Sequence, residues 1–273
     1  MFKTLIVAPL FSSSAANATY IGTQTAGVLI DVGCSYRALR AAMKLCDIQP
    51  TAIKAVLITH EHCDHVKGLL QFAKHNPTMP IFAPYQTRLQ LIQRELILGT
   101  CTGRLHDTSR IAVPELDWVL TAFETPHDSF DSAGYTLTTG CGVKIAYFTD
   151  LGEVTKTIKA ATLGVDFAII ESNYDTDLLT ANPNYNYETK ERIKSRLGHL
   201  SNPDSAEYIC ELVESGTTQI VLAHLSRENN TPKLARDTAV RRLLRAGAKH
   251  GRDYTLGVAE IQTSGEVFAV NKN

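Results

Sequence analysis

The chain has 273 residues, of which 44% are hydrophobic, so it is long and apolar enough to bury a sizeable core. Its formal net charge of −1 gives no overall basic field that would indicate a nucleic-acid partner, although a local groove can still be basic. No apolar run approaches the roughly 20 residues of a membrane span, and the six cysteines are scattered, so we expect a reduced, cytoplasmic protein with no membrane partner.

The first half of the chain alternates strand and helix signals. The segment MFKTLIVAPLF indicates a first strand, since a signal peptide would need a longer apolar core and a small-residue cleavage site. Short β-branched runs bounded by turn residues predict strands over 3–9, 25–33, 53–60 and 80–84. Apolar residues at helical spacing predict helices over 35–47, about 64–75, and 85–98.

The second half continues the alternation, with a hairpin that turns at TGCG. The predicted strands cover 117–127, 133–150 (the hairpin), 165–173, 218–224, 254–261 and 266–271. Helices are predicted over 202–215, with Asn202 as N-cap and Pro203 at the first helical position, and over 231–251. No repeat or linker interrupts residues 1–273, so we expect a single domain of two sheets packed face to face with helices outside.

The predicted strands end in residues that can bind metal. AVLITH ends at His60, FETPH at His127, IAYFTD at Asp150 and IVLAH at His224. Strand ends have fixed relative positions in a layered fold, so a site can assemble there. Imidazole nitrogens and carboxylate oxygens are ligands for zinc, and also for manganese or iron.

The segment HEHCDH carries the densest cluster of such residues. His60 and His62 lie two apart on an extended turn, so both can face one ion. Asp64 and His65 open the next helix and can face a second ion. Two ions would need about seven ligands, which the strand ends supply.

These motifs resemble those of the metallo-β-lactamase fold superfamily over nearly the whole chain. THEHCDH is similar to its HxHxDH signature, and His127, Asp150 in FTDLG and His224 in LAHLS match its later motifs. The resemblance implies an α/β fold, a four-layer αββα sandwich of two mixed β-sheets. It also implies two divalent ions, Zn²⁺ or Mn²⁺, that hold a hydroxide between them. One ion would take His60, His62 and His127, and the other Asp64, His65 and His224, with Asp150 bridging.

More narrowly, LGHLSNPDSAEYI and LAHLSRENNTPKLA resemble the bacterial YycJ/WalJ group of metallohydrolases, described as DNA exonucleases acting 5′ to 3′. The tRNA 3′-processing endonuclease branch is similar as well. The chain departs from the group after the first strand. The group usually has a glycine-rich SGSxGN loop there, whereas FSSSAAN keeps Ser14 and Asn17 without the glycines, so the backbone path is not defined by the sequence.

His199 in GHLSN is predicted to act in catalysis, with Asp64 and Glu171. It precedes a helix start, where unpaired amides suit a phosphate, and an imidazole there could protonate a leaving oxygen. The alternative is a loop histidine that helps to cap the helix. Glu171 in ESNYD is either a carboxylate that orients a catalytic imidazole or a residue of a surface turn.

The other candidate residues are expected to have structural or surface roles. Cys63 is expected to be a small buried residue rather than a ligand, and Glu61 to point away from the metals. The three histidines outside the motifs, at 75, 106 and 250, are expected in loops or on the surface. The segment 182–199 mixes tyrosines with lysines and arginines, which suits single-stranded nucleic acid, but its glutamates fit a solvated helix face equally well.

The sequence therefore predicts a metal-dependent phosphodiesterase or nuclease with a nucleic-acid substrate, DNA in the YycJ/WalJ interpretation. The alternative is a hydrolase of small esters, a thioesterase or lactonase, on the same site. A non-catalytic metal scaffold is disfavoured, because it has no need of seven ligands and His199. A flavin-linked di-iron oxidoreductase is disfavoured because that branch has a glutamate where this chain has His62. The sequence does not define whether DNA or RNA is preferred, which end is attacked, which metal is bound or the oligomeric state.

Overall fold

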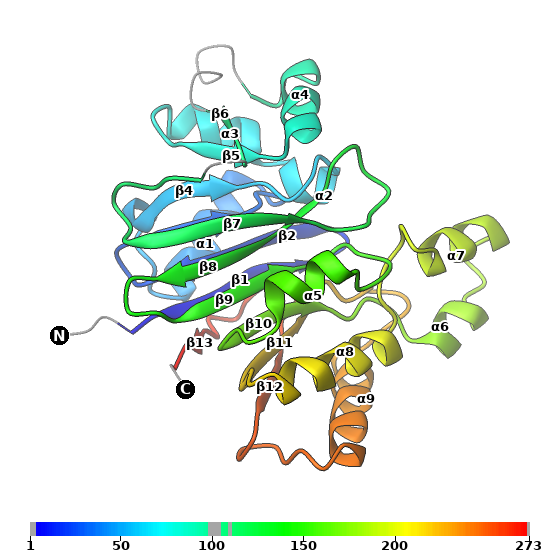
Figure 1. Ribbon diagram of the computed structural model, residues 1–273. Coiled ribbons are helices and arrows are strands. Elements are labelled where there is room, and N and C mark those ends of the chain that lie inside the picture. The colour runs from blue at the N-terminus through cyan, green and yellow to red at the C-terminus, as the bar shows by residue number, and fades with distance from the viewer. Residues whose placement is uncertain (1–3, 98–104, 109–110, 272–273) are drawn as a thin grey trace.

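The fold is described by a computed structural model, which covers residues 4–97, 105–108 and 111–271. Two mixed β-sheets face each other, and helices cover their outer faces (Figure 1). This four-layer α/β arrangement confirms the predicted αββα sandwich.

The first sheet contains the N-terminal strands. Its order is β13 (Phe268–Ala269), β1 (Ile6–Ser13), β2 (Ala16–Gly22), β3 (Gly27–Ile30), β4 (Ile53–Leu57), β5 (Ile81–Ala83) and β6 (Leu105–Asp107). The pairs from β13 to β3 are antiparallel, and those from β3 to β6 are parallel.

The second sheet has the same mixed character. Its order is β12 (Thr255–Val258), β11 (Gln219–Ala223), β10 (Phe167–Glu171), β9 (Lys144–Phe148), β8 (Ala133–Thr139) and β7 (Trp118–Glu124). The strands from β9 to β12 are parallel, whereas β7, β8 and β9 form an antiparallel meander. Carboxyl ends of parallel strands meet at one edge of a sheet, so each sheet offers such an edge to a site.

Alternating side chains of each sheet divide the core into three layers. In β3, Val28 and Ile30 face the second sheet, while Leu29 faces the helices. The outer face of the first sheet packs against α1 (Tyr36–Leu45) and α3 (Leu69–His75), and that of the second sheet against α5 (Lys156–Thr162), α8 (Asn202–Glu214) and α9 (Pro232–Arg245). Burial on both faces explains why the parallel strands are continuous apolar runs.

The remaining helices are short and lie near loops. They are the 3₁₀ turn η1 (Pro50–Ala52), α2 (Cys63–Val66), α4 (Tyr85–Gln93), α6 (Thr176–Ala181) and α7 (Tyr187–Lys194). Within the part of the chain that is described, no helix has the length and apolarity to cross a membrane.

Several element boundaries differ from the sequence prediction. Strand β2 was not predicted, because ANATYIG mixes polar and apolar residues although all but Ala16 are buried. The helix predicted over 64–75 is two helices, α2 and α3, with Gly68 as the N-cap of the second. The predicted helix 85–98 ends at Gln93, and residue 98 lies outside the described residues. The N-cap of α8 is Ser201, whose hydroxyl accepts from Asp204 N, rather than Asn202.

Candidate metal centre

The candidate site lies where the carboxyl ends of strands from both sheets meet. His60 follows β4, Asp150 follows β9 and His224 follows β11, and all three side chains are buried. Asp150 and His224 have φ values of 59° and 53°, in the left-handed region that non-glycine residues seldom adopt. Backbone strain of this kind is found at functional sites, where surrounding contacts hold it in place.

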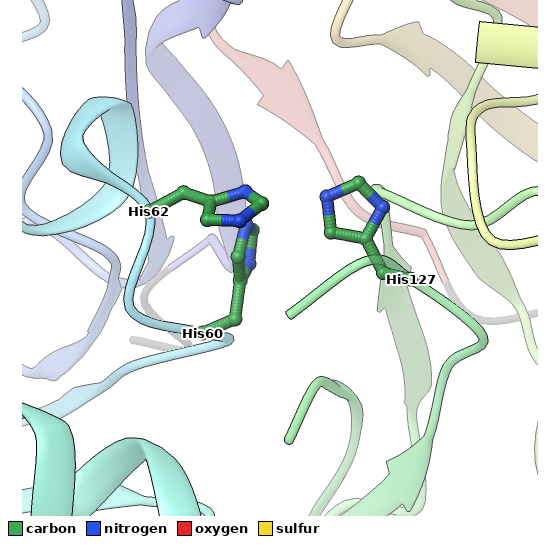
Figure 2. A group of neighbouring side chains, drawn as sticks. All are labelled: His60, His62 and His127. Atoms are coloured by element: carbon green, nitrogen blue, oxygen red, sulfur yellow. The ribbon is translucent and has the colours of Figure 1, made fainter. Parts of the chain in front are cut away.

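Three histidines form the first half of the site. His60 and His62 lie in the segment between β4 and α2, and His127 follows β7 (Figure 2). Their ring centroids are 4.6 Å (His60–His62), 5.0 Å (His60–His127) and 5.1 Å (His62–His127) apart. One nitrogen of each ring lies within 4.8 Å of the others, so the three can face a single ion.

The second half contains Asp64, His65 and His224, whose donor atoms also lie within 4.8 Å of one another. Asp150 lies between the halves. Its Oδ2 is 3.4 Å from His65 Nε2, and its Oδ1 is 3.7 Å from His127 Nε2. The structure thus brings together all seven predicted ligands in the two predicted groups.

The hydrogen bonds of these histidines fit a divalent ion. The Nδ1 atom of His60 lies 3.0 Å from Thr59 Oγ1, and that of His127 lies 3.1 Å from Gly198 O. With Nδ1 occupied, Nε2 of each ring remains for a metal, as in most protein metal sites. His60 Nε2, His224 Nε2 and Asp150 Oδ2 are buried without a hydrogen-bond partner among the described residues, a costly arrangement that a cation would relieve.

The electrostatics of the two halves differ. Burial, together with His65 and His127, holds the pKa of His60 well below its usual value. A neutral imidazole is the form that binds a metal, so His60 can bind a cation without losing a proton.

The second half holds protons more tightly. Burial opposes a charge on His65 and His224, but nearby carboxylates, Asp150 first, outweigh burial and raise the pKa of both rings, that of His224 to about 10. Protons therefore compete with a metal in the second half, since a protonated Nε2 cannot be a ligand.

Asp31, which the sequence analysis missed, supports the second half. It follows β3, has a φ of 61° and is fully buried. Its Oδ2 is 2.7 Å from His65 Nδ1, and it accepts from Thr59 N and Thr59 Oγ1, each at 2.8 Å. A carboxylate on the distal nitrogen orients the ring and increases its basicity as a ligand. The sequence contains a signal for Asp31, because it directly follows the apolar run GVLI, just as the predicted ligands follow their apolar strands.

The segment FSSSAAN forms a tight hairpin between β1 and β2, in which Ser12 pairs with Asn17. Asn17 Nδ2 donates to Asp64 Oδ2 at 3.2 Å, and Ser12 Oγ accepts from His224 N at 2.8 Å. A Cβ on Gly33 would lie 1.6 Å from Asp64 O, so glycine is required there for the hairpin and α2 to approach. Ser12 and Asn17 thus hold two ligand segments in position.

Glu171 connects the site to His199. Its Oε1 lies 2.9 Å from His199 Nδ1 and 2.7 Å from His224 Nδ1, and its Oε2 accepts from Leu200 N at 2.9 Å. Burial would raise the pKa of Glu171, but His199 and His224 outweigh burial and hold that pKa below its usual value. Glu171 is fully buried, so it does not belong to a surface turn.

His199 is not a helix cap. Ser201 caps α8, while the His199 side chain is 15% exposed and turned toward Glu171. The α8 amides are partly used within the protein, since Asn202 N donates to Tyr174 O and Asp204 N to Ser201 Oγ. The expected phosphate site at this helix start is therefore not supported.

The remaining candidates lie outside the cluster. Glu61 is buried and points away from the metal ligands, because it accepts from Thr87 Oγ1 and Phe130 N, both at 3.1 Å. Cys63 is exposed rather than buried as predicted, because it is the first residue of the short helix α2. The three histidines outside the motifs are exposed, as expected: His75, His106 and His250.

The basic residues near α7 are largely engaged with protein acceptors. Arg192 Nη1 lies 2.5 Å from Asp128 Oδ2, Arg196 Nη2 lies 2.6 Å from Glu153 Oε1, and Lys190 Nζ donates to Thr180 O. These pairs favour the solvated helix face over a free nucleic-acid surface.

The family match and the similar proteins point to the same family. The model of the Beta-lactamase superfamily domain matches residues 27–225, which include all seven predicted ligands. Exodeoxyribonuclease YycJ from Bacillus anthracis is 32% identical over 83% of this chain and 84% of its own length. Exodeoxyribonuclease WalJ from Streptococcus pneumoniae is 31% identical over 93% of this chain and 92% of its own length.

Solved structures share the fold. Zn²⁺-bound PqqB from Methylobacterium extorquens aligns with a TM-score of 0.69 at 16% sequence identity, covering 97% of this chain and all of that one. This likeness shows the fold, while the family match and the cluster of histidines and aspartates indicate a centre for divalent metal.

Proposed function

The chain belongs to the β-lactamase superfamily domain family of metal-dependent hydrolases, and on that premise we propose that it hydrolyses phosphodiester bonds of nucleic acid. The names of the YycJ and WalJ relatives support this proposal, since both are exodeoxyribonucleases that align over most of the chain.

The observation that carries the proposal is the pairing of His199 with Glu171 at 2.9 Å, beside the ligand cluster. The nucleotide alkoxide that leaves in phosphodiester cleavage is strongly basic and needs a proton. Glu171 occupies Nδ1 of His199, so Nε2 is the ring nitrogen that would deliver this proton. Glu171 stays ionised, because its pKa is lowered, and its carboxylate orients the His199 ring.

The proposed cofactor is a pair of divalent ions, Zn²⁺ or Mn²⁺. The residues that would hold them are His60, His62 and His127 for one ion, and Asp64, His65 and His224 for the other, with Asp150 shared. Bound ions of this kind lower the pKa of water to about 7 and neutralise phosphate oxygens. Asp31 and Thr59 would keep His65 oriented, and Glu171 would do the same for His224.

We propose further that the substrate is DNA, degraded from the 5′ end toward the 3′ end. DNA is supported by the names of the relatives, and the direction by the resemblance to the YycJ/WalJ group, which is described as acting 5′ to 3′.

A substrate panel tests the proposal. The purified protein is assayed with Zn²⁺ or Mn²⁺ on single-stranded DNA and RNA, bis-nitrophenyl phosphate and a thioester. We expect hydrolysis of DNA and bis-nitrophenyl phosphate, and turnover of the thioester alone would replace the proposal by the small-ester alternative. Oligonucleotides labelled at either end, with circular DNA as a control for internal cleavage, determine the direction of attack.

A further inference from the structure

The loop between β7 and β8, residues 125–132, contains His127 and also the exposed ring of Phe130. Phe130 is the only exposed residue of this described segment, with 60% of its surface accessible. The other residues of the loop are polar, apart from the half-buried Pro126, so the most apolar side chain is the one that faces solvent. Single exposed apolar side chains are common on protein surfaces, but this ring lies three residues from the predicted ligand His127, so it is a candidate contact for a substrate of the site.

The backbone of Phe130 is held by the segment that carries His60 and His62. Its N–H donates to Glu61 Oε1 at 3.1 Å, and Glu61 lies between His60 and His62 in the chain. Two residues earlier, Asp128 pairs with Arg192 of α7, and one residue later Asp131 O accepts from Thr87 of α4 at 2.6 Å. The loop is thus tied to three elements, and Figure 1 shows it beside α2 at the edge where α7 also lies. A ring on such a support loses little conformational freedom when it binds a ligand.

A cleft of about 370 Å³ lies elsewhere on α1, but a second one, of about 340 Å³, adjoins this loop. Asp131, Ser132 and the half-exposed Tyr85 contribute to its lining. The cleft gives open space on one side of the loop that carries Phe130.

We propose that Phe130 stacks on an unpaired base next to the phosphate that is cleaved. The proposal rests on the proposed nuclease function and specifies how that site would recognise a nucleotide. Every base has a π face, so stacking would favour single-stranded substrate without reading its sequence. Phe130 would then be a residue that positions the strand, while the chemistry stays with the metal centre and His199.

Substrates that lack one base test this contact. Single-stranded oligonucleotides carry an abasic residue on one side or the other of the terminal scissile phosphate, and kcat/KM is compared with that of the complete strand. Stacking on an aromatic ring corresponds to about a 5- to 100-fold preference for the complete strand at one of the two positions. The preference should appear in KM, because the contact is made equally in the ground and transition states.

The variants are compared by the ratio of kcat/KM on the complete strand to kcat/KM on the abasic strand. Phe130→Ala should reduce it to about one, and Phe130→Trp should retain it. Val119→Ala, at the opposite end of β7 with 67% exposure, is the matched control and should keep the wild-type ratio. Metal content is measured for each variant, to separate loss of the ring from damage to the loop.

The two proposals fail in different ways. If the wild-type enzyme cleaves DNA but treats complete and abasic strands alike, or if Phe130→Ala keeps the preference, the stacking proposal is wrong and the nuclease function stands. If the metal-loaded wild type cleaves no phosphodiester at all, the proposed function itself fails.

Discussion

Replacing His199 by alanine should separate the protonation of the leaving group from the rest of the chemistry. A positioned general acid contributes about 10²- to 10⁴-fold, which corresponds to about 3–5 kcal/mol of barrier. His199→Ala should therefore slow DNA cleavage by at least a hundredfold. Bis-nitrophenyl phosphate releases a stabilised phenolate that needs little help, so its hydrolysis should slow by less than about tenfold.

The structure indicates that this variant will fold. His199 is 15% exposed, and when its ring is removed, Glu171 still contacts His224 Nδ1 and accepts from Leu200 N. Glu171 is then not left unpaired, so the loss of one hydrogen bond should lower the free energy of unfolding by about 1–2 kcal/mol. His75→Ala is the control, because His75 lies on the surface at the end of α3, where it stacks on Tyr36.

The assay compares kcat on both substrates with metal content measured on the same preparation. His199 also lies within a group that could hold a metal, with Asp150, Glu171 and His224, so it could instead be a ligand. Equal slowing of both substrates, or loss of metal, would refute its assignment as the acid.

Three further predictions concern the metal centre. Asp150→Asn should abolish hydrolysis of both substrates and lower the metal content measured by elemental analysis, because Asp150 adjoins both halves; an active variant with full metal would contradict this. Asp31→Asn should fold, since asparagine tolerates the left-handed backbone. It should weaken metal binding about 10- to 100-fold, because it removes the carboxylate that contacts His65. An unchanged metal affinity in a titration against a chelator would show that Asp31 has no such role. Burial opposes a charge on His224, but Asp150 and other carboxylates raise its pKa to about 10, so a proton must leave before Nε2 binds metal. Apparent affinity should therefore rise from pH 7 to 9 in a competition assay, by about tenfold per pH unit for each of His65 and His224 that must lose a proton, and a flat profile would exclude this linkage.

Much of the site could be predicted because its residues end apolar strands. The runs before His60, Asp150 and His224 are buried on both faces, so their β-branched composition identifies the strands and their ends. What could not be predicted is which polar residue near a strand end faces inward. Asp31 carries the same signal as Asp150, and only the fold reveals that it contacts His65.

Other features depend on contacts between distant segments, which a local pattern does not contain. Cys63 looked buried beside His62, yet it opens a helix of only four residues and faces solvent. The hairpin around Ser14 has no glycine, yet its antiparallel register brings Asn17 to Asp64. Helix α7 was not defined either, because most of its residues are polar and only Ile193 is buried.

Three of the five described non-glycine residues with positive φ share one physical arrangement, and it accounts for the shape of the centre. Asp31, Asp150 and His224 each end a strand that is paired in parallel, and each has a φ between 53° and 61°. In an extended continuation the side chains would alternate across the sheet, whereas a left-handed residue turns the chain and redirects its side chain. Such residues cost about 1–3 kcal/mol each, so neighbouring hydrogen bonds must hold them. The backbone bonds are present: Asp31 N donates to Leu57 O, Asp150 N to Glu171 Oε1, and His224 N to Ser12 Oγ. The two sheets therefore hold the acidic and imidazole groups close together through bonds that need no metal, and a cation that enters meets donors already in position.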